Sequence, residues 1–374
     1  MRTTKQGVLY VRTRSQILRC NSHTLGKLNK TRGEIMQISE YVSLGHPDKV
    51  ADYISSFLLD KYIRKDPNTR FAVECQIKGN IVNLAGEITS KAKFTQKQIK
   101  HFVKMAVDKV GYTKHYQRKW GKENTICGSD LKVKTYITEQ SPDIARGLDG
   151  WGDQGIFFGC AYPREDYDYM EGTKYLSTII GDELYKENIV GKDIKVLVVK
   201  KEGRLAKVVI AAPILNEKQF KTSKVLNDAR AICEDAKCPF IINGTGVFHK
   251  HGPLADSGTT GRKLVVDFYG GSCQIGGGSP WTKDGTKADL TLNLYARYLA
   301  LKFLKDNDFK EPVFCDIACA IGSRKIDICI HSADGIILKQ YTEEKSPKEL
   351  IKFFKLDTPI YAELCKNGLF SRIK

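Results

Sequence analysis

Residues 251–289 read HGPLADSGTTGRKLVVDFYGGSCQIGGGSPWTKDGTKAD. This stretch holds two glycine-rich loops separated by one short apolar run, residues 264–269, and its charged side chains are Arg262, Lys263, Lys283, Lys287, Asp256, Asp267, Asp284 and Asp289. Glycine lets backbone N–H groups approach an anion, lysine and arginine neutralise it, and aspartate binds the magnesium that a polyphosphate carries. The composition therefore favours a polyphosphate site. The alternative is a pair of surface turns around a buried strand, with solvated charges.

The glycines at 276–278 do not make an ordinary Walker A loop. Such a loop has glycine directly before its lysine and serine or threonine directly after it. Here Thr282 precedes Lys283 and Asp284 follows it. The pattern therefore disfavours a P-loop NTPase and leaves a polyphosphate site of another design.

The composition of the whole chain narrows the class of protein. A length of 374 residues allows two or three domains, and 41% hydrophobic residues indicate a globular chain. No run of about 18 apolar residues occurs, so we expect no membrane span. The net charge of +17 is spread along the chain without a nucleic-acid-binding motif, so we expect no nucleic-acid partner. Eleven cysteines without a CxxC pair indicate reduced thiols and a cytoplasmic location.

The first 33 residues differ from the rest of the chain. They carry eight Lys or Arg, seven Ser or Thr and no acidic residue. This composition predicts a disordered basic N-terminal extension, and an organelle-targeting presequence is the alternative.

A helix N-terminus follows at residue 46. Pro47 suits the first helical position, apolar residues then recur at helical spacing, and Asp66-Pro67 ends the pattern. The positive end of the helix dipole favours an anion beside His46, and Asp48 is free to bind a metal ion. The alternative is that Asp48 complements the dipole and His46 is a loop residue.

Residues 69–90 are typical of a hairpin that turns at Gly79-Asn80. That turn places Glu74 opposite Ala85 and Glu87 opposite Ala72, so the two glutamates lie on one sheet face, roughly 7–8 Å apart. This face is either open to solvent or a cation-binding surface against another subunit.

Helical and strand patterns alternate through the rest of the chain and predict an α+β fold of three repeated β/α units. The glycine-rich residues 141–155 form either a mobile lid over a site or a linker. We divide the chain into the extension 1–33, an N-terminal domain 34–138, a central domain 139–250 and a C-terminal domain 251–374.

The motifs GHPDK (45–49), GEIT (86–89), QSPDI (140–144), GDQG (152–155) and GRKLVVDFYGG (261–271), followed by GGG, KD, Lys287 and Asp289, occur in this order. Over residues 36–370 the chain resembles the methionine adenosyltransferase (S-adenosylmethionine synthetase) family. The resemblance implies a pseudo-threefold arrangement of the three β/α units. It also implies a homodimer or dimer of dimers, in which packed sheet faces build the active site at the subunit interface.

The resemblance implies an enzyme that makes S-adenosylmethionine from ATP and L-methionine. The methionine sulfur attacks ribose C5′ and displaces triphosphate, which is then cleaved to pyrophosphate and phosphate. A neutral thioether needs no general base, so the reaction depends on placing cations and orienting methionine. The alternative is a non-catalytic or regulatory nucleotide-binding subunit of the same fold.

The resemblance also assigns site residues. Two Mg²⁺ are expected at Asp48 and Asp289, and one K⁺ at Glu74. Catalytic and ATP-binding roles are expected for His46, Lys195, Arg262, Lys263, Lys283 and Lys287, and further contacts to ATP for Asp153, Asp193, Phe248 and Asp256. Methionine contacts are expected for Glu87, Gln140, Asp256 and Lys287.

The chain departs from the family pattern at several points. Leu44 stands where the family usually has Glu, and residues 279–282 read Ser-Pro-Trp-Thr where Ala-Phe-Ser-Gly is usual. The chain is also shorter than expected between residues 144 and 152 and between 356 and 359. We expect these departures to affect the lid and triphosphate cleavage rather than the fold.

Overall fold

The computed structural model describes residues 36–141 and 150–373. The predicted basic extension 1–33 therefore lies outside the described residues. So do residues 142–149 of the predicted lid.

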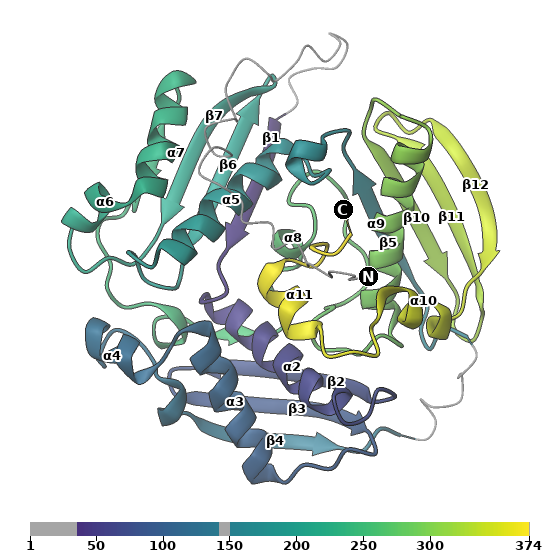
Figure 1. Ribbon diagram of the computed structural model, residues 1–374, viewed down its shortest axis with the longest axis horizontal. Coiled ribbons are helices and arrows are strands. Elements are labelled where there is room, and N and C mark those ends of the chain that lie inside the picture. The colour runs from purple at the N-terminus through teal and green to yellow at the C-terminus, as the bar shows by residue number, and fades with distance from the viewer. Residues whose placement is uncertain (1–35, 142–149, 374) are drawn as a thin grey trace, which may run out of the picture.

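Three four-stranded sheets organise the described residues (Figure 1). The N-terminal sheet has the order β4-β3-β2-β9, the central sheet β1-β6-β7-β8 and the C-terminal sheet β12-β11-β10-β5. The strand bounds are β1 Met36–Val42, β2 Arg70–Lys78, β3 Ile81–Thr89, β4 Lys132–Thr138, β5 Gly155–Ala161, β6 Lys195–Lys201, β7 Arg204–Ala211, β8 Phe240–Ile242, β9 Gly258–Thr259, β10 Val313–Cys319, β11 Lys325–Ser332 and β12 Ile337–Glu344.

Each sheet receives one of its two edge strands from another part of the chain. β1 precedes the N-terminal sheet in sequence but pairs with β6 of the central sheet. β5 precedes the central sheet but pairs with β10 of the C-terminal sheet, and β9 precedes the C-terminal sheet but pairs with β2 of the N-terminal sheet. The three exchanges form a closed ring, which confirms an α+β fold of three repeated units.

The exchanged strands cross the predicted domain boundaries at 138/139 and 250/251. With β1, β5 and β9 crossing over, no sheet is made from a single continuous third of the chain. The division by sequence stays a prediction about how the chain is partitioned.

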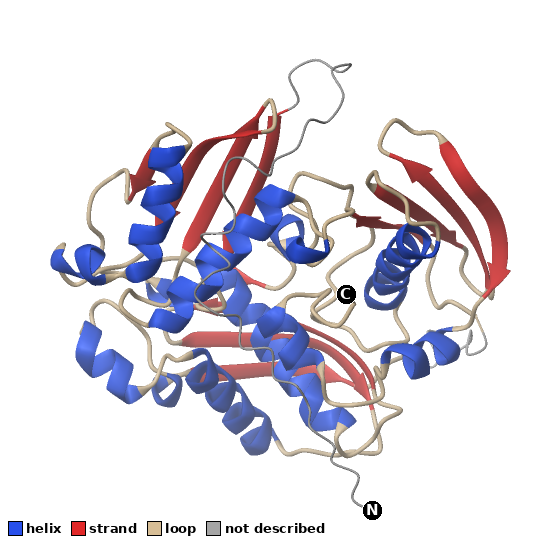
Figure 2. Cartoon of the chain, turned by 45° about the horizontal axis from the view of Figure 1, so that its top comes forward, coloured by secondary structure: helices blue, strands red, loops and turns tan. Residues whose placement is uncertain are grey.

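A long helix packs on each sheet and faces the middle of the molecule (Figure 2). These helices are α2 Pro47–Ile63 on β2, α5 Gly172–Glu187 on β1 and β6, and α9 Ala288–Asp306 on β5 and β10. The other helices are α3 Gln96–Val110, α4 Lys114–Trp120, α6 Lys218–Thr222, α7 Lys224–Asp235, α8 Leu264–Asp267, α10 Pro347–Phe354 and α11 Tyr361–Asn367. Their ends follow local chemistry: Thr95 and Gln98 form a capping box on α3, and Gly111 ends that helix in the left-handed region.

The predicted hairpin is confirmed in its register. Glu74 pairs with Ala85 and Glu87 with Ala72, across a turn in which Gly79 has φ 53°. Alternation then places both glutamates on the face opposite the buried residues Phe71, Val73 and Cys75.

The structure contradicts one alternative that the sequence left open, and it contains one strand that the sequence did not predict. The alternative of two surface turns around a buried strand is wrong for residues 264–269, which contain the short helix α8. This helix begins the segment that ends at the buried Tyr269. Strand β12 alternates half-exposed with exposed residues, so its apolar signal is weak, and it is held by its pairing with β11.

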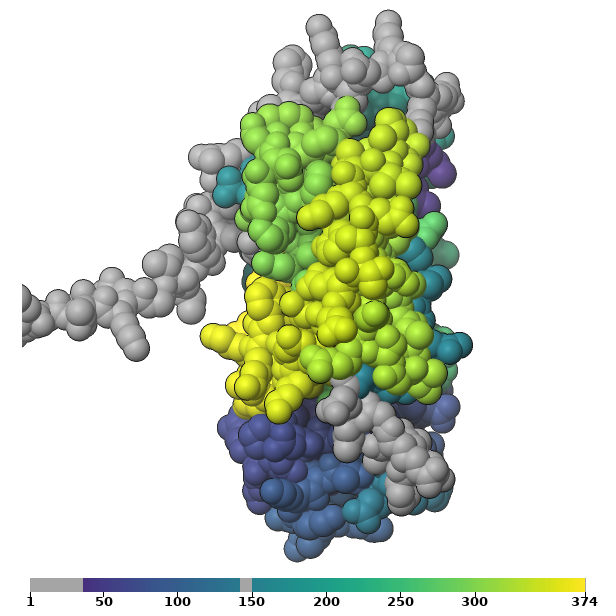
Figure 3. Space-filling model, turned by 90° about the vertical axis from the view of Figure 1, so that its right-hand side faces the viewer, coloured from purple at the N-terminus to yellow at the C-terminus, as the bar shows by residue number. Residues whose placement is uncertain are grey.

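The end of the chain packs back onto the first helix. Asp60 near the end of α2 accepts the backbone N–H groups of Tyr361 and Ala362 at 2.9 and 3.0 Å, where α11 begins. Figure 3 shows the last residues, in yellow, along one narrow side of the molecule. Across the described residues, no helix combines the length and apolar character needed to cross a membrane.

Candidate active site

The N-terminus of α2 carries the first candidate group. His46 is the N-cap, and its Nδ1 accepts the backbone N–H of Asp48 at 3.2 Å. This bond requires a lone pair on Nδ1, so a neutral ring carries its proton on Nε2. Burial, together with the nearby ammonium groups of Lys263 and Lys195, lowers the pKa of His46 to about 3. His46 is therefore a neutral Nε2–H donor at physiological pH.

Asp48, the second residue of α2, is held by β9 and by the glycine-rich loop that follows it. Its Oδ1 accepts the Thr259 N–H at 2.9 Å and lies 3.3 Å from Arg262 Nε, and its Oδ2 accepts from Lys263 Nζ at 2.6 Å. Burial alone would raise the pKa of Asp48, but the bonds from Lys263 and Thr259 outweigh it and lower that pKa. We call His46, Asp48, Arg262 and Lys263 the α2 cluster.

The N-terminus of α9 carries a second group of the same design. Asp289, the second residue of α9, accepts the Gly278 N–H at 2.6 Å and forms an ion pair with Lys283. Lys287, the N-cap residue, pairs with Asp284 at 2.6 Å. Asp284 in turn accepts the Phe71 N–H at 2.7 Å, which ties the loop to β2. We call Lys283, Asp284, Lys287 and Asp289 the α9 cluster.

The two glycine-rich loops that feed these clusters touch each other. A Cβ added to Gly261 would lie 2.9 Å from the Cβ of Ser279, so only glycine allows this approach. Beneath the contact, Trp281 Nε1 donates to Asp267 Oδ2 at 2.7 Å, and Lys49 Nζ lies 2.6 Å from Asp267 Oδ1. Trp281, one of the unusual residues of the 279–282 loop, is therefore a buried side chain that supports both loops.

A row of paired residues crosses the N-terminal sheet from the α9 cluster. Lys283 forms an isolated bridge with Ala72, Ala72 pairs with Glu87, and Glu87 pairs with Thr138. Neighbouring strands lie about 4.8 Å apart, so Lys283 and Glu87 are about 10 Å apart on one sheet face. Gln140 follows two residues beyond Thr138. Within the described residues, its Oε1 is buried without a hydrogen-bond partner.

Glu74 lies on the same sheet face and contacts the first loop. Its carboxylate accepts the Thr260 hydroxyl. Thr260 is fixed in turn, because its N–H donates to the Cys75 carbonyl at 3.0 Å and its Oγ1 accepts the Cys75 N–H at 3.2 Å. The sheet therefore presents a carboxylate and a hydroxyl oxygen side by side.

Three further predicted residues surround the α2 cluster. Lys195 and Asp256 are close enough to His46 to change its pKa. Asp193 Oδ2 accepts the Gly252 N–H at 2.9 Å, and burial raises the pKa of Asp193 to about 6. Lys195 begins β6 and pairs with Val42, four residues before His46, so the exchanged strand β1 brings this lysine to the site.

Asp153 and Phe248 are not joined to either cluster by a direct contact among the described residues. Asp153 is exposed, and its carbonyl accepts from the Cys319 thiol at 3.5 Å. The Cys319 thiol also feels the charges of Asp153 and Asp289, so Asp153 lies on the α9 side. Phe248 is half-buried, and its carbonyl accepts the Ile214 N–H at 3.3 Å.

The described residues contain no group of three or more His, Cys, Asp or Glu side chains placed to hold a metal ion. A magnesium ion that arrives with a polyphosphate needs only one or two carboxylates, since phosphate and water oxygens complete its octahedron. Asp48 and Asp289 each offer such a carboxylate. Both are paired here with lysine, the charge that a metal ion would replace.

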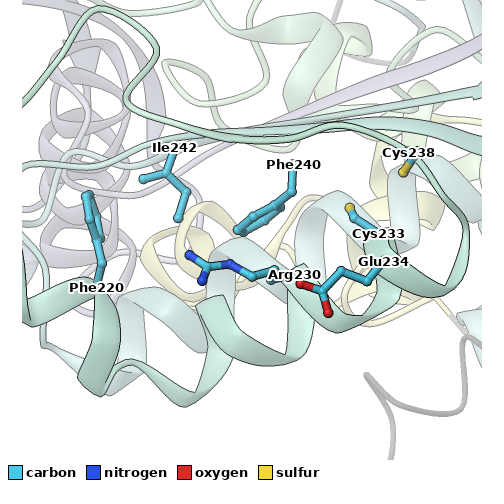
Figure 4. Close-up of a pocket in the computed structure, with 7 residues that line it drawn as sticks. All are labelled: Phe220, Arg230, Cys233, Glu234, Cys238, Phe240 and Ile242. Atoms are coloured by element: carbon cyan, nitrogen blue, oxygen red, sulfur yellow. The ribbon is translucent and has the colours of Figure 1, made fainter.

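A hollow of about 450 Å³ in the central unit lies apart from these clusters. It is lined by Phe220, Arg230, Cys233, Glu234, Cys238, Phe240 and Ile242 (Figure 4). None of these is a predicted site residue, so the hollow does not mark the predicted ATP site.

Several residues that shape the site carry no clear signal in the sequence. Thr259 and Thr260 hold Asp48 and Glu74 through an amide and a hydroxyl, and neither role follows from residue type. Asp52 accepts the Gly261 N–H at 2.9 Å and so fixes the first loop. Its position one helical turn after Asp48 was the one available hint.

Comparisons with known proteins identify relatives of this chain. Residues 34–142 match the S-adenosylmethionine synthetase N-terminal domain and residues 250–374 match its C-terminal domain. S-adenosylmethionine synthase 2 of Rhodospirillum rubrum is 31% identical over 91% of this chain and 93% of that protein. S-adenosylmethionine synthase of Acholeplasma laidlawii is 33% identical over 90% and 94%.

A solved structure is also similar. An unusual S-adenosylmethionine synthetase from Campylobacter jejuni superposes with a TM-score of 0.77 at 28% identity, over 90% of this chain and 94% of that one. Together, the two matched domains, these relatives and the shared fold show that the chain belongs to the S-adenosylmethionine synthetase family.

Proposed function

We propose that the protein is a methionine adenosyltransferase that makes S-adenosylmethionine from ATP and L-methionine. The observation that carries the proposal is the pair of helix N-termini, α2 and α9. Each has a carboxylate at its second position, bound by a backbone N–H and by a lysine of a glycine-rich loop. Two such ends, served by touching loops, suit the two ends of a magnesium-bound triphosphate.

The cations have a defined task in this reaction. The methionine sulfur forms a bond to ribose C5′ while the bond from C5′ to the triphosphate oxygen breaks, so negative charge grows on the triphosphate. Arg262 and Lys263 of the α2 cluster, Lys283 and Lys287 of the α9 cluster, and Lys195 would neutralise that charge. Lysines now paired with Asp48 and Asp289 would turn to phosphate oxygens when Mg²⁺ takes their place.

His46 would stabilise the leaving oxygen. As a neutral ring with its proton on Nε2, it can donate a hydrogen bond to the oxygen that leaves C5′ without being consumed as an acid. Its fixed tautomer is supplied by the Asp48 N–H.

Methionine would bind along the sheet row. Glu87 supplies a carboxylate for the ammonium group, and Gln140 Oε1, which has no partner among the described residues, supplies a second acceptor nearby. A substrate donor would therefore satisfy a buried acceptor that is otherwise costly to leave unpaired. We assign Asp153, Asp193, Phe248 and Asp256 to the adenosine side and its neighbourhood.

The chemistry of the donor atoms suits the expected ions. Asp48 and Asp289 would each contribute a carboxylate to Mg²⁺, and Glu74 with Thr260 would contribute oxygens to K⁺. When bound, the magnesium ions screen the triphosphate charge during its departure.

We further propose a homodimer with the active site at the subunit interface. The sheet faces opposite the helices carry exposed apolar side chains, including Ile38 of β1, Tyr136 of β4, Ile156 of β5 and Leu197 of β6. Glu74 and Glu87 lie on this kind of face and would be enclosed by a second copy. Since the reaction uses ATP and a free amino acid, we place the enzyme in the cytoplasm.

The direct test is S-adenosylmethionine formation by the purified protein with ATP, L-methionine, Mg²⁺ and K⁺, measured by chromatography together with phosphate and pyrophosphate. Lys283→Met should abolish turnover while the dimer stays folded, and Lys218→Met, an exposed lysine on α6, should leave it unchanged. ATP binding without product would instead select a non-catalytic, regulatory subunit of this fold.

A further inference from the structure

A second surface suited to binding anions lies away from the proposed active site. A hollow of about 670 Å³ is lined by Lys97, Lys100, His101, Lys104, Leu131, Lys132, Val133 and Lys134. Five of these eight side chains are lysines and none is acidic. The nearest acids on the same elements are exposed: Asp108 on α3, and Asp130, which accepts from the Ser129 hydroxyl.

The lining residues define where the hollow runs. Residues 97, 100, 101 and 104 are spaced i, i+3, i+4 and i+7, so they form one stripe along α3. Leu131 directly precedes β4 and residues 132–134 begin it, and consecutive strand residues point to opposite sheet faces. A hollow lined by all four must therefore follow the edge of the strand, not one of its faces.

That edge pairs with no further strand in the described residues. β4 is the outermost strand of the N-terminal sheet, with β3 as its one hydrogen-bonded neighbour (Figure 1). An edge strand presents a row of backbone N–H and C=O groups that can pair with an added strand. We call this edge and the α3 stripe the lysine groove.

We propose that the lysine groove binds an extended acidic segment of a partner protein, which pairs with the edge of β4 and points its carboxylates at the α3 stripe. Alternate residues of a strand are about 6.6 Å apart and successive turns of a helix about 5.4 Å, so carboxylates on one face of the segment can pair with lysines of the α3 stripe where α3 crosses the strand. The chain's own residues 1–33 are an unsuitable occupant because they carry eight cations and no acid.

Charge and shape favour a peptide over a nucleic acid. A single-stranded nucleic acid is normally bound on aromatic side chains that stack its bases, and the lining of the groove has only the imidazole of His101. Strand pairing, in contrast, uses the open backbone edge, which a phosphodiester chain cannot match hydrogen bond for hydrogen bond.

The test uses the full-length protein and a fluorescein-labelled peptide of alternating glutamate and valine, with binding followed by fluorescence anisotropy. The triple variant Lys97→Gln, Lys100→Gln, Lys104→Gln should weaken binding about tenfold, from the loss of three charge pairs near the surface. The matched control Lys207→Gln, Lys218→Gln, Lys221→Gln changes three exposed lysines of the central unit and should leave binding unchanged. Circular dichroism of both variants checks that they are folded.

Two further arms separate strand pairing from simple charge attraction. N-methylation of alternate backbone nitrogens of the peptide removes the donors that would pair with β4 and should weaken binding further. Equal binding of the methylated peptide, equal loss in the control variant, or absence of peptide binding would overturn the proposal. So would tighter binding of a single-stranded oligonucleotide of the same charge through the same lysines.

Discussion

The N-termini of α2 and α9 are built alike but differ in how far they are closed. In both, an aspartate at the second helical position accepts a backbone N–H and pairs with a lysine of a glycine-rich loop. Asp48 has a side chain 1% exposed and a third partner in Arg262, whereas the Asp289 side chain is 15% exposed. The α2 end therefore serves both fold and chemistry, while the α9 end can open to a ligand at a smaller cost in stability.

The largest expected effect tests whether both ends serve one nucleotide. Asp48→Asn and Asp289→Asn should each lower turnover by at least about 1,000-fold, because each removes a carboxylate proposed for magnesium beside the triphosphate. Steady-state S-adenosylmethionine formation measures this. Normal turnover in one of the two variants would break the proposed equivalence of the two ends.

The two helix ends should differ in their contribution to thermodynamic stability, although both are expected to be essential for turnover. Asp48→Ala should lower the free energy of unfolding by about 3 kcal/mol, since it leaves the Thr259 amide unpaired in a buried site and two cations without their acceptor. Asp289→Ala should lower it by about 1 kcal/mol, because water reaches its partners. Urea unfolding gives both values, and equal losses would contradict the difference in closure.

The far end of α2 offers a pH-dependent contrast with Asp48. Burial raises the pKa of Asp60 to about 6, although the Tyr361 and Ala362 amides oppose this. A carboxyl group with a raised pKa contributes stability that is complete below pH about 4 and is lost as the pH rises through about 6. Asp60→Asn should not show this loss.

The stability of the Asn variant relative to the wild type should therefore rise by about 2 kcal/mol between pH 4 and pH 6.5. Unfolding curves at four pH values would show it. A constant difference would mean that Asp60 keeps its ordinary pKa in the folded protein.

The smallest expected effect concerns the support beneath the two loops. Trp281→Phe removes the hydrogen bond from Nε1 to Asp267 but keeps an aromatic ring near Lys49. It should therefore lower the free energy of unfolding by about 1 kcal/mol. If Trp281 only supports the loop, turnover should fall less than in Lys283→Met. A loss as large as that of Lys283→Met would place the ring in the catalytic machinery.

Features that depend on neighbouring residues in the sequence were predicted correctly. Pro47 and the apolar spacing after it located α2, and the Gly79-Asn80 turn set the register that puts Glu74 and Glu87 on one face. These features depend on neighbours in sequence, where propensity and turn chemistry act directly.

Contacts between distant residues could not be read the same way. The pairing of Asp48 with Lys263 depends on β9, a strand of two residues with no periodic signal. The approach of Lys195 to His46 depends on the pairing of β1 with β6. Both contacts arise from tertiary pairing that overrides local preference.

The ring of exchanged strands also sets an order on protein synthesis. A nascent chain emerges from its first residue onward, so β2, β3 and β4 are available long before Gly258 and Thr259 arrive to flank β2. The sheet that is begun first is thus completed only after two thirds of the chain have been translated. Truncation at residue 250 should therefore leave β2 with an unprotected edge, prone to join other chains.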